Sequence, residues 1–398
     1  MARGHVETRP LRRPWTRRRA PARRSPAAHP ARDVTSLALL APLAQPRAIA
    51  DQSALRVAGP AAAHIGELWD FLLVTGGVVS AVTIGLLLYA LFRRRRADEL
   101  PPEADRPADP RGERANDESG GRGRAGEGRP ASERAGARWM VIAGIAVPAV
   151  ILTVVLVLTL RTLAAVVAPA DAIASETPRP GEHVIEVTGR QFWWEVRYLD
   201  ADAGRVFETA NELRIPVGRP VILRLRSIDV IHSFWVPGLQ GKMDLVPGRT
   251  NVLRIEADRP GVWRGQCAEF CGVQHAKMAM VVVAEPPERY ERWAAGQRRP
   301  APTPADPAAD ADRRAFHASG CVYCHAVRGT PAGGDLGPDL THVASRLTLA
   351  AGVLPNRPGN LYGWIADPQA HKPGSRMPAL PLAPDQLHAI ARYLGTLR

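Results

Sequence analysis

The hydrophobic residues of this chain gather into stretches of different length and spacing. Two stretches, at about 68–92 and about 139–160, are almost continuously apolar and contain no Asp, Glu, Lys or Arg except Asp70 at the edge of the first. A helix needs roughly 20 such residues to cross a bilayer, and a buried core helix rarely has that length without charge. The pattern therefore predicts a hairpin of two transmembrane helices within residues 51–170.

Arginine residues follow the first predicted span directly. Arg93–Arg96 begin a connecting segment that runs to Arg138 and is rich in Arg, Glu, Gly and Pro. Clustered Arg keeps short loops on the cytoplasmic side of a membrane, so we expect this loop in the cytoplasm and both termini outside. Because the loop has almost nothing apolar to bury, we expect it to be disordered. The whole chain beyond residue 160 is then extracytoplasmic.

From residue 182 onward the hydrophobic positions form short runs separated by Pro-Gly and Val-Gly turns. Runs of this kind are typical of strands, and several of them in succession indicate a β-sandwich or barrel over residues 182–290. The predicted strands are His183–Val187, Gln191–Tyr198, Glu212–Ile215, Val221–Ser227, Asn251–Ala257 and Ala279–Val283.

Two further segments complete the chain. Residues 298–310 are rich in Pro and Ala, which indicates a semi-stiff linker. Residues 311–398 contain a helical pattern at 385–397 and have the right length for a small all-α domain. The predicted fold class is therefore multidomain, with a two-helix transmembrane hairpin, a β-sandwich or barrel, and an all-α domain.

The positive charge is concentrated at the N-terminus. A net charge of +13 and a pI near 10.5 would suit a nucleic-acid-binding protein, but residues 1–50 hold eleven Arg against two acidic residues. No recognisable nucleic-acid-binding motif accompanies them, so we exclude this partner. The basic stretch precedes an apolar run at 34–43 and small residues before Asp51, which is the order of a secretory signal. We expect residues 1–50 to be a leader; a wrongly chosen upstream start codon is the alternative.

All four cysteines lie in two short motifs, as Cys267 with Cys271 and Cys321 with Cys324. Paired cysteines in an exported protein would by default indicate disulfides. The first pair, however, belongs to the pattern C-x-E-x-C-x3-H-x2-M. Two thiolates, an imidazole and a thioether suit copper better than a hard cation. Zinc also accepts Cys2His2, but a structural zinc site does not need the methionine, so copper is favoured.

A full ligand set needs a second imidazole, and His232, which we expect to end a strand upstream, can supply it. At this point the sequence resembles the second subunit of haem-copper cytochrome c oxidases, whose outward cupredoxin domain holds the binuclear CuA centre. The resemblance rests on the two spans, on residues 229–233, on residues 241–251 and on the loop from Cys267 to Met278.

This resemblance implies a role for each residue of the motif. Cys267 and Cys271 would both bridge two copper ions, and His232 and His275 would each bind one of them. Met278 and the main-chain carbonyl of Glu269 would be weak outer ligands. The Glu269 side chain would also reach a magnesium ion shared with the large subunit.

The second cysteine pair lies in Cys321-Val322-Tyr323-Cys324-His325, the C-x-x-C-H pattern of covalent c-type haem attachment, with His325 placed to bind the iron. A thioredoxin-like pair is the alternative, but no βαβ pattern surrounds it. The sixth iron ligand is expected to be Met or His. The segment resembles class I cytochrome c, with Gly-Pro-Asp-Leu at 337–340 before the distal loop. The resemblance implies Met377 as that ligand, with His342, His371 and His388 as competitors.

A cytochrome fused to a CuA subunit resembles the caa-type oxidase branch over about residues 51–398. The likeness implies a protein of the bacterial inner membrane, in contact with lipid, that has no catalytic residues for oxygen chemistry. Electrons would come from an upstream cytochrome or quinol-oxidising complex, and would pass through the haem and then CuA to subunit I, which reduces O2 to water. A CuA-containing subunit of a nitric oxide reductase and a copper-binding assembly protein are the alternatives.

One position departs from the pattern of the family. Members that accept electrons from soluble cytochrome c usually have Trp where this chain has Phe192. The sequence therefore leaves open which residue receives the electron.

Overall fold

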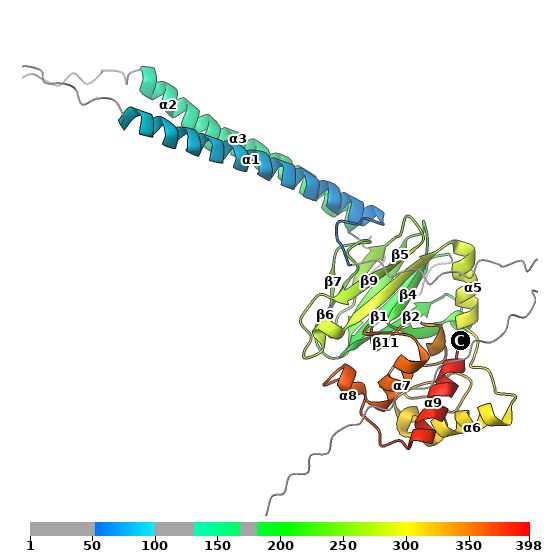
Figure 1. The fold of residues 1–398 in the computed structure, drawn as a ribbon. Helices are drawn as coiled ribbons and strands as arrows, with labels where there is room; N and C mark the ends of the chain where they lie inside the picture. The colour runs from blue at the N-terminus through cyan, green and yellow to red at the C-terminus, as the bar shows by residue number, and fades with distance from the viewer. Residues whose placement is uncertain (1–51, 99–130, 168–180) are drawn as a thin grey trace, which may run out of the picture. The chain divides into compact units, whose positions relative to one another are not determined.

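The computed structural model describes residues 52–98, 131–167 and 181–398 (Figure 1). The expected leader at 1–50 and most of the expected cytoplasmic loop lie outside these residues. Within them, all elements belong to one compact unit of the chain.

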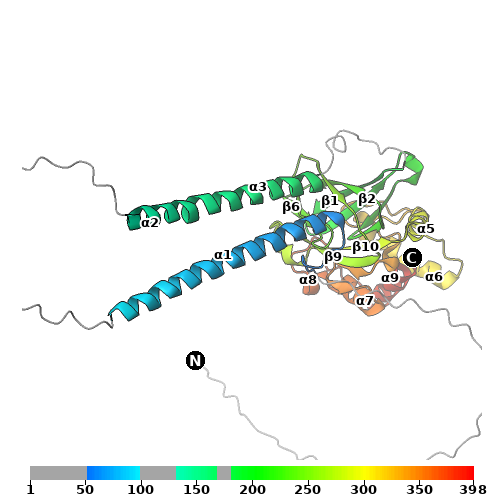
Figure 2. The ribbon, with the colours of Figure 1, turned by 90° about the horizontal axis from the view of Figure 1, so that it is seen from above.

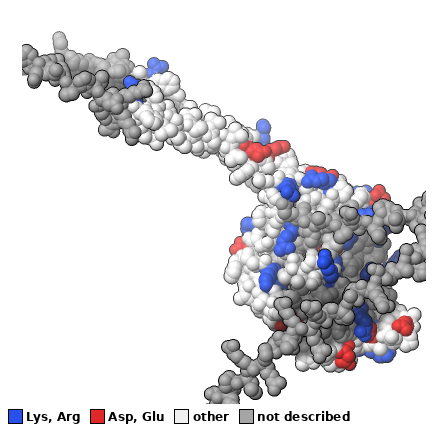
Figure 3. Space-filling model, in the orientation of Figure 1, with Lys and Arg blue, Asp and Glu red and all other residues white. Residues whose placement is uncertain are grey.

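Two long helical segments contain the predicted membrane spans (Figure 2). The first is α1, Pro60–Asp98, and the second combines α2, Ala131–Val141, the π-helical turn η1, Ile142–Ala146, and α3, Val147–Val166. Their apolar side chains are exposed, and Figure 3 shows long stretches of both segments without charge. A surface of that length and composition fits the interior of a bilayer. Both helices continue beyond the predicted limits because helical hydrogen bonding does not stop where the apolar residues stop.

The predicted β-sandwich consists of two five-stranded sheets. In the first, the order β3-β2-β1-β5-β8 joins Phe207–Ala210, Trp193–Leu199, His183–Arg190, Val221–Ser227 and Asn251–Ile255. In the second, the order β4-β10-β9-β6-β7 joins Glu212–Pro216, Ala279–Glu285, Gly261–Cys267, His232–Trp235 and Met243–Leu245. The pairs β1–β5 and β4–β10 are parallel, and the other pairs are antiparallel. The inner faces bury large residues such as Trp194, Leu223 and Phe234.

All six predicted strands are present, and β3, β6, β7 and β9 are additional. The first three of these have only three or four residues, and β9 is interrupted by glycines, so none shows a clear alternation of polar and apolar residues. His232 was expected to end a strand but instead begins β6. The correction follows from the turn after β5, where the Ser227 hydroxyl bonds the Val230 carbonyl at 2.5 Å and starts a new strand.

A helix that the sequence did not indicate, α5 at Pro287–Gln297, packs on the sandwich after β10. Tyr290 and Ala294 enter the same core as the strands. Trp293 lies edge-on to Tyr198 and Phe207, with ring centroids 5.3 and 5.6 Å away.

The C-terminal domain is mainly helical, as predicted. Its helices are α6, Pro307–Ala318, α7, Pro358–Ala366, α8, Pro368–His371, and α9, Pro384–Thr396, with the short turns η4, Gly320–Tyr323, and η5, Val343–Ser345, and the small strands β11, Thr348–Leu349, and β12, Leu354–Pro355. Helix α9 packs against α6 and α7 around Phe316, Ile390 and Tyr393. The expected linker is shorter than 298–310, because α6 begins at Pro307, where the Asp306 carboxylate caps the Ala309 N–H at 3.1 Å.

Candidate copper and haem centres

The predicted copper loop connects two paired strands of the second sheet. Cys267 is the last residue of β9, and Met278 immediately precedes β10. The Cys267 N–H donates to the Met278 carbonyl at 2.9 Å and closes the loop at its base. The Ala268 N–H donates to the Ser233 carbonyl, also at 2.9 Å, which attaches the loop to β6. Strand pairing therefore places His232, the first residue of β6, beside the loop.

The structure brings all six predicted copper ligands together. The Cys267 and Cys271 sulfur atoms are 3.8 Å apart. His232 Nδ1 lies 3.9 Å from the Cys267 sulfur, and the Glu269 carbonyl oxygen lies 3.2 Å from the same sulfur. His275 Nδ1 and the Met278 sulfur each lie 3.8 Å from the Cys271 sulfur. Both cysteines, His232 and Met278 are buried.

These distances fit a pair of metal ions better than a disulfide or a single ion. A disulfide bond is about 2.05 Å long, whereas two thiolates that share a metal at about 2.3 Å can be up to about 4.6 Å apart. The two imidazoles lie next to different sulfurs. Among the described residues, the donors that all lie within 4.8 Å of one another belong to His232, Cys267 and Cys271, and His275 is outside this group. A tetrahedral zinc site would need all four donors around one point.

Asp229 orients the His232 ring, a role that we did not anticipate from the sequence. His232 Nε2 donates to an Asp229 carboxylate oxygen at 2.8 Å, which leaves Nδ1 available to a metal. Asp229 also accepts the N–H groups of Gln191 and Val230 at 2.7 and 2.8 Å. A side chain at Gly189 would place Cβ 2.6 Å from the His232 ring, so only glycine fits there. In the sequence, the sign of this role was the position of Asp229, three residues before the candidate ligand His232.

The charges around this ring are strongly coupled. Burial alone would raise the pKa of Asp229, but hydrogen bonds from His232 and from main-chain N–H groups lower it to about 2. Burial would lower the pKa of His232, yet the bonds with Asp229 and Cys267 raise it above its usual value. The hydrogen bond from Cys271 lowers the pKa of the Cys267 thiol well below its usual value, despite burial. A lowered pKa favours the thiolate form of Cys267, which is the form that binds metals.

Phe192 and the Glu269 side chain lie at the copper loop. The sequence had drawn attention to the first as a departure from the family pattern and to the second as a predicted magnesium ligand. Phe192 is only 7% exposed, and its ring lies against Gly272, where a Cβ would come within 3.1 Å. The Glu269 side chain is about half exposed, and its carboxylate lies 3.9 Å from the Lys242 amine. The magnesium ion expected at Glu269 stays a prediction.

The predicted haem-attachment cysteines lie in and just after the short turn η4. Cys321 is inside it and Cys324 follows it, both partly exposed and not joined in a disulfide. His325 Nδ1 donates to the Pro338 carbonyl at 2.8 Å, so Nε2 is available to an iron atom. Gly337 is required here, because a Cβ would lie 2.6 Å from the His325 ring. These residues fit a covalently attached c-type haem with His325 as one axial ligand.

Met377 lies on the chain between α8 and α9. Its main-chain carbonyl accepts the Gln369 side-chain amide at 2.7 Å, but no described hydrogen bond or sulfur contact joins it to His325. Its role as the sixth ligand stays a prediction. Of the competitors, His342 is buried and bonded through Nε2 to the Arg299 carbonyl at 3.0 Å. His388 packs 4.6 Å from Tyr362, and His371 lies 6.5 Å from Trp364, by ring centroids.

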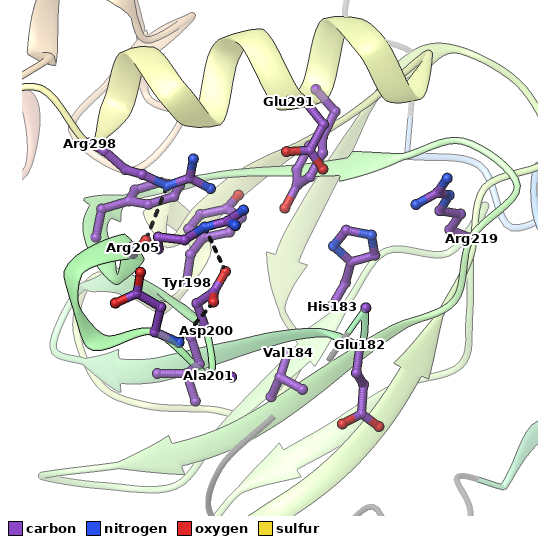
Figure 4. A pocket seen from close by; sticks show the side chains of 15 residues that line it. Glu182, His183, Val184, Tyr198, Asp200, Ala201, Arg205, Arg219, Glu291 and Arg298 are labelled. Carbon is purple, nitrogen blue, oxygen red and sulfur yellow. Dashed lines mark hydrogen bonds and ion pairs between the residues drawn. The ribbon is translucent and has the colours of Figure 1, made fainter. Parts of the chain in front are cut away.

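A pocket of about 400 Å³ lies away from the copper loop, beside α5 and the ends of β1 and β2 (Figure 4). His183, Arg219 and Arg298 line it, together with the acidic Asp200 and Glu291. None of the predicted copper or haem ligands belongs to it, and its mixed charges favour no single class of ligand.

Residues 192–285 match the family described as cytochrome c oxidase subunit II, periplasmic domain, and residues 310–398 match the family described as cytochrome c. The cytochrome c oxidase subunit 2 of Branchiostoma floridae is 35% identical over 173 residues, which cover 39% of this chain and 69% of that protein. The chain belongs to the cytochrome c oxidase subunit 2 family. The first match implies a CuA centre, and the second implies a haem c.

Bacterial relatives carry the same name. Cytochrome c oxidase subunit 2 of Alkalihalophilus pseudofirmus is 41% identical over 224 residues, which cover 56% of this chain and 64% of the relative. The protein of Bacillus sp. (strain PS3) is 34% identical over 227 residues, covering 54% and 62%. This chain thus spans slightly less than two thirds of either relative. The solved periplasmic domain of cytochrome oxidase subunit II from Bradyrhizobium japonicum matches with 27% identity over 31% of this chain and 96% of that domain, but its TM-score of 0.28 supports no conclusion.

Proposed function

We propose that the chain passes electrons one at a time from its own c-type haem, through a CuA centre, to a separate haem-copper subunit that reduces O2 to water. One observation carries the proposal. Two imidazoles lie at opposite ends of a pair of thiol sulfurs 3.8 Å apart, in a chain that also contains the C-x-x-C-H pattern. Shared thiolates spread one electron over two metals, so that neither metal changes geometry much when it is reduced.

The residues of this chain would have separate tasks in the transfer. Cys267 and Cys271 would bridge the metals, His232 and His275 would bind one each, and the other two donors would be weak outer ligands. Asp229 would hold His232 in the tautomer that presents Nδ1. The surrounding strands would exclude water from the buried sulfurs.

In the C-terminal domain, Cys321 and Cys324 would attach the haem, and His325 and Met377 would bind its iron. A thioether ligand favours a high reduction potential. An upstream cytochrome or quinol-oxidising complex would deliver electrons to this haem first. A tethered donor does not have to be captured by diffusion, because a short linker gives it an effective concentration of about a millimolar.

The surroundings of the chain follow from its two apolar helical segments. Both would cross a bacterial inner membrane, with the arginines after the first span on the cytoplasmic side and both redox domains outside. Subunit I and other oxidase subunits would be the protein partners of this chain. A magnesium ion shared with subunit I at Glu269 belongs to the same proposal.

The test is metal and haem analysis of the full chain purified in detergent with its partners. We expect two copper ions and one haem per chain, and an electron paramagnetic resonance signal of a mixed-valence pair. Two copper ions without that signal would instead support a copper-binding assembly protein. Consumption of NO rather than O2 by the co-purified large subunit would support a nitric oxide reductase.

A further inference from the structure

The segment that leads from α8 to Met377 lies against the copper loop. Two hydrogen bonds join the segment to the loop, and a third joins it to the β1–β2 turn, each at a main-chain carbonyl. The Lys277 amine donates to the His371 carbonyl at 2.7 Å, and the Gln274 amide donates to the Pro373 carbonyl at 2.5 Å. The Lys372 amine completes the set by donating to the Phe192 carbonyl at 2.6 Å. The segment before the predicted haem ligand is thus attached to both the copper loop and the β1–β2 turn.

Lys372 is the most unusual member of this contact. It is only 3% exposed, although lysines are almost never fully buried without a partner. Its amine donates to carbonyls of both domains, to Phe192 at 2.6 Å and to Ala350 at 3.3 Å. Burial lowers its pKa to about 7. Burying a lysine amine costs free energy, so its burial here indicates a specific contact between the domains.

Arg376, next to the predicted haem ligand Met377, reaches the residue that orients the copper ligand. Its guanidinium lies 3.8 Å from one Asp229 carboxylate oxygen, and it donates to the Gln191 side chain at 3.4 Å. The other Asp229 oxygen accepts the hydrogen bond from His232. A continuous series of contacts therefore runs from Met377 through Arg376 and Asp229 to His232.

A second patch attaches the same domain to the edge of the β-sandwich. The Ala279 N–H donates to the Ala351 carbonyl at 3.0 Å, and Arg264 donates to the Gly352 carbonyl at 3.1 Å. Nearby, the Leu347 N–H donates to the Glu212 carboxylate at 2.7 Å. Ala351 has a φ of 59°, a conformation that alanine seldom adopts and that surrounding structure must hold. Two separate patches fix the orientation of the domain better than one.

We propose that Lys372 and Arg376 dock the cytochrome domain on the copper loop, and that the Arg376–Asp229 pair connects the haem side with the copper side. The proposal rests on the proposed function and names its internal route. With both groups bound, the transfer would move one electron from ferrous iron to the oxidised copper pair, and no bond would form or break. Lys372 and Arg376 are positioning residues in this scheme, because neither binds a metal.

The docked state can be tested without any redox measurement, because the chain contains only three lysines, at positions 242, 277 and 372. The full chain in detergent is treated with an amine-acetylating reagent, and each lysine is followed by mass spectrometry. We expect Lys372 to react at least about 10-fold more slowly than the exposed Lys242, because its amine is inaccessible to the reagent and hydrogen-bonded to two carbonyls until the contact opens. Arg376→Ala should make Lys372 more reactive, whereas Arg376→Lys should largely restore its protection. Equal reactivity of Lys372 and Lys242 in the unaltered chain would overturn the docking.

The electronic route is tested by the rate at which a photoreduced haem passes its electron to copper. We expect Arg376→Ala to slow this step by about 10-fold or more, the effect of a small misplacement of reacting groups. The haem and copper spectra should not change. Arg392→Ala is the matched control, since Arg392 pairs with Asp312 in its own domain at 2.6 Å. An unchanged rate in Arg376→Ala would overturn the route. Absence of either centre from the unaltered chain would defeat the proposed function, and the acetylation result would still decide the docking.

Discussion

The predicted copper ligands and the predicted haem ligands are positioned in different ways. Each copper donor lies within 3.9 Å of one of the two cysteine sulfurs, and β6, β9 and their hydrogen bonds hold the donors there. On the haem side, His325 is held by the Pro338 carbonyl, but no described contact links it to Met377. Among the described residues, the strands themselves therefore bring the copper donors together, whereas the two predicted iron ligands are held by separate contacts.

The largest expected effect is on folding, when the cysteines of one centre or the other are replaced. In Cys321→Ser/Cys324→Ser, we expect the C-terminal domain to unfold, because its main core has only 13 buried residues against 29 in the sandwich. A small core gives a domain little stability in excess of what folding requires. The matched Cys267→Ser/Cys271→Ser variant should lose copper but keep its sandwich folded.

Limited proteolysis with mass spectrometry measures both variants on one scale. Rapid cleavage within residues 311–398 of the haem-free variant, with an intact sandwich in the copper-free variant, is the expected pattern. If the C-terminal domain of the haem-free variant resisted proteolysis as well as the sandwich of the copper-free variant, the two domains would not differ in their dependence on a cofactor.

The next effect concerns the sixth iron ligand. Met377→Leu should lower the reduction potential of the haem by on the order of 0.1 V, a fraction of the roughly 0.8 V over which axial ligands tune haem proteins. Redox titration followed by the haem absorption measures the change, and the copper signal serves as the internal control. If spectrum and potential stayed the same, the ligand would be His342, His371 or His388 instead.

A smaller effect is expected at the residue that orients His232. Asp229→Ala should weaken copper binding about 10- to 100-fold, the usual cost of losing a hydrogen-bond partner of a metal ligand. Competition with a copper chelator measures the affinity, and the haem spectrum should not change. An unaltered affinity would mean that the strands alone hold the ring.

The smallest expected effect is on the pH dependence of stability. It involves both domains, because Glu208 of the sandwich is repelled by Asp339 of the C-terminal domain. Burial, followed by repulsion from Glu195 and Asp339, raises the pKa of Glu208 to about 7. The folded chain then binds more protons than the unfolded chain between pH 4.5 and 7, so the stability due to Glu208 falls as the pH rises through this window. Glu208→Gln should therefore stabilise the chain at pH 8, by about 1–2 kcal/mol after allowance for solvent screening, and leave it unchanged at pH 4. Thermal melting at both pH values measures this, and a gain at pH 4 would contradict the sign.

Much of the architecture was accessible from local patterns. The two spans, six of the ten sandwich strands and the final helix follow from runs of apolar residues whose period needs no tertiary contact. Strands β6, β7 and β9, which surround the copper loop, were missed. Their pairing partners, rather than their own residues, make them strands. The same applies to α5, whose Tyr290 and Ala294 are helical positions that become buried only against the sandwich.

The sequence by itself determined which atoms are available for redox chemistry, because soft donors at fixed spacing have few other uses. Only the tertiary structure decided how they are arranged. It placed His232 beside Cys267 across 35 positions of sequence, since β6 and β9 pair, and it gave Asp229 its role. It also brought Arg376 to Asp229 and Lys372 to the Phe192 carbonyl. Spacing along the chain specifies neighbours within a loop or a helical turn, whereas contacts between strands and domains depend on which faces bury their apolar residues against each other.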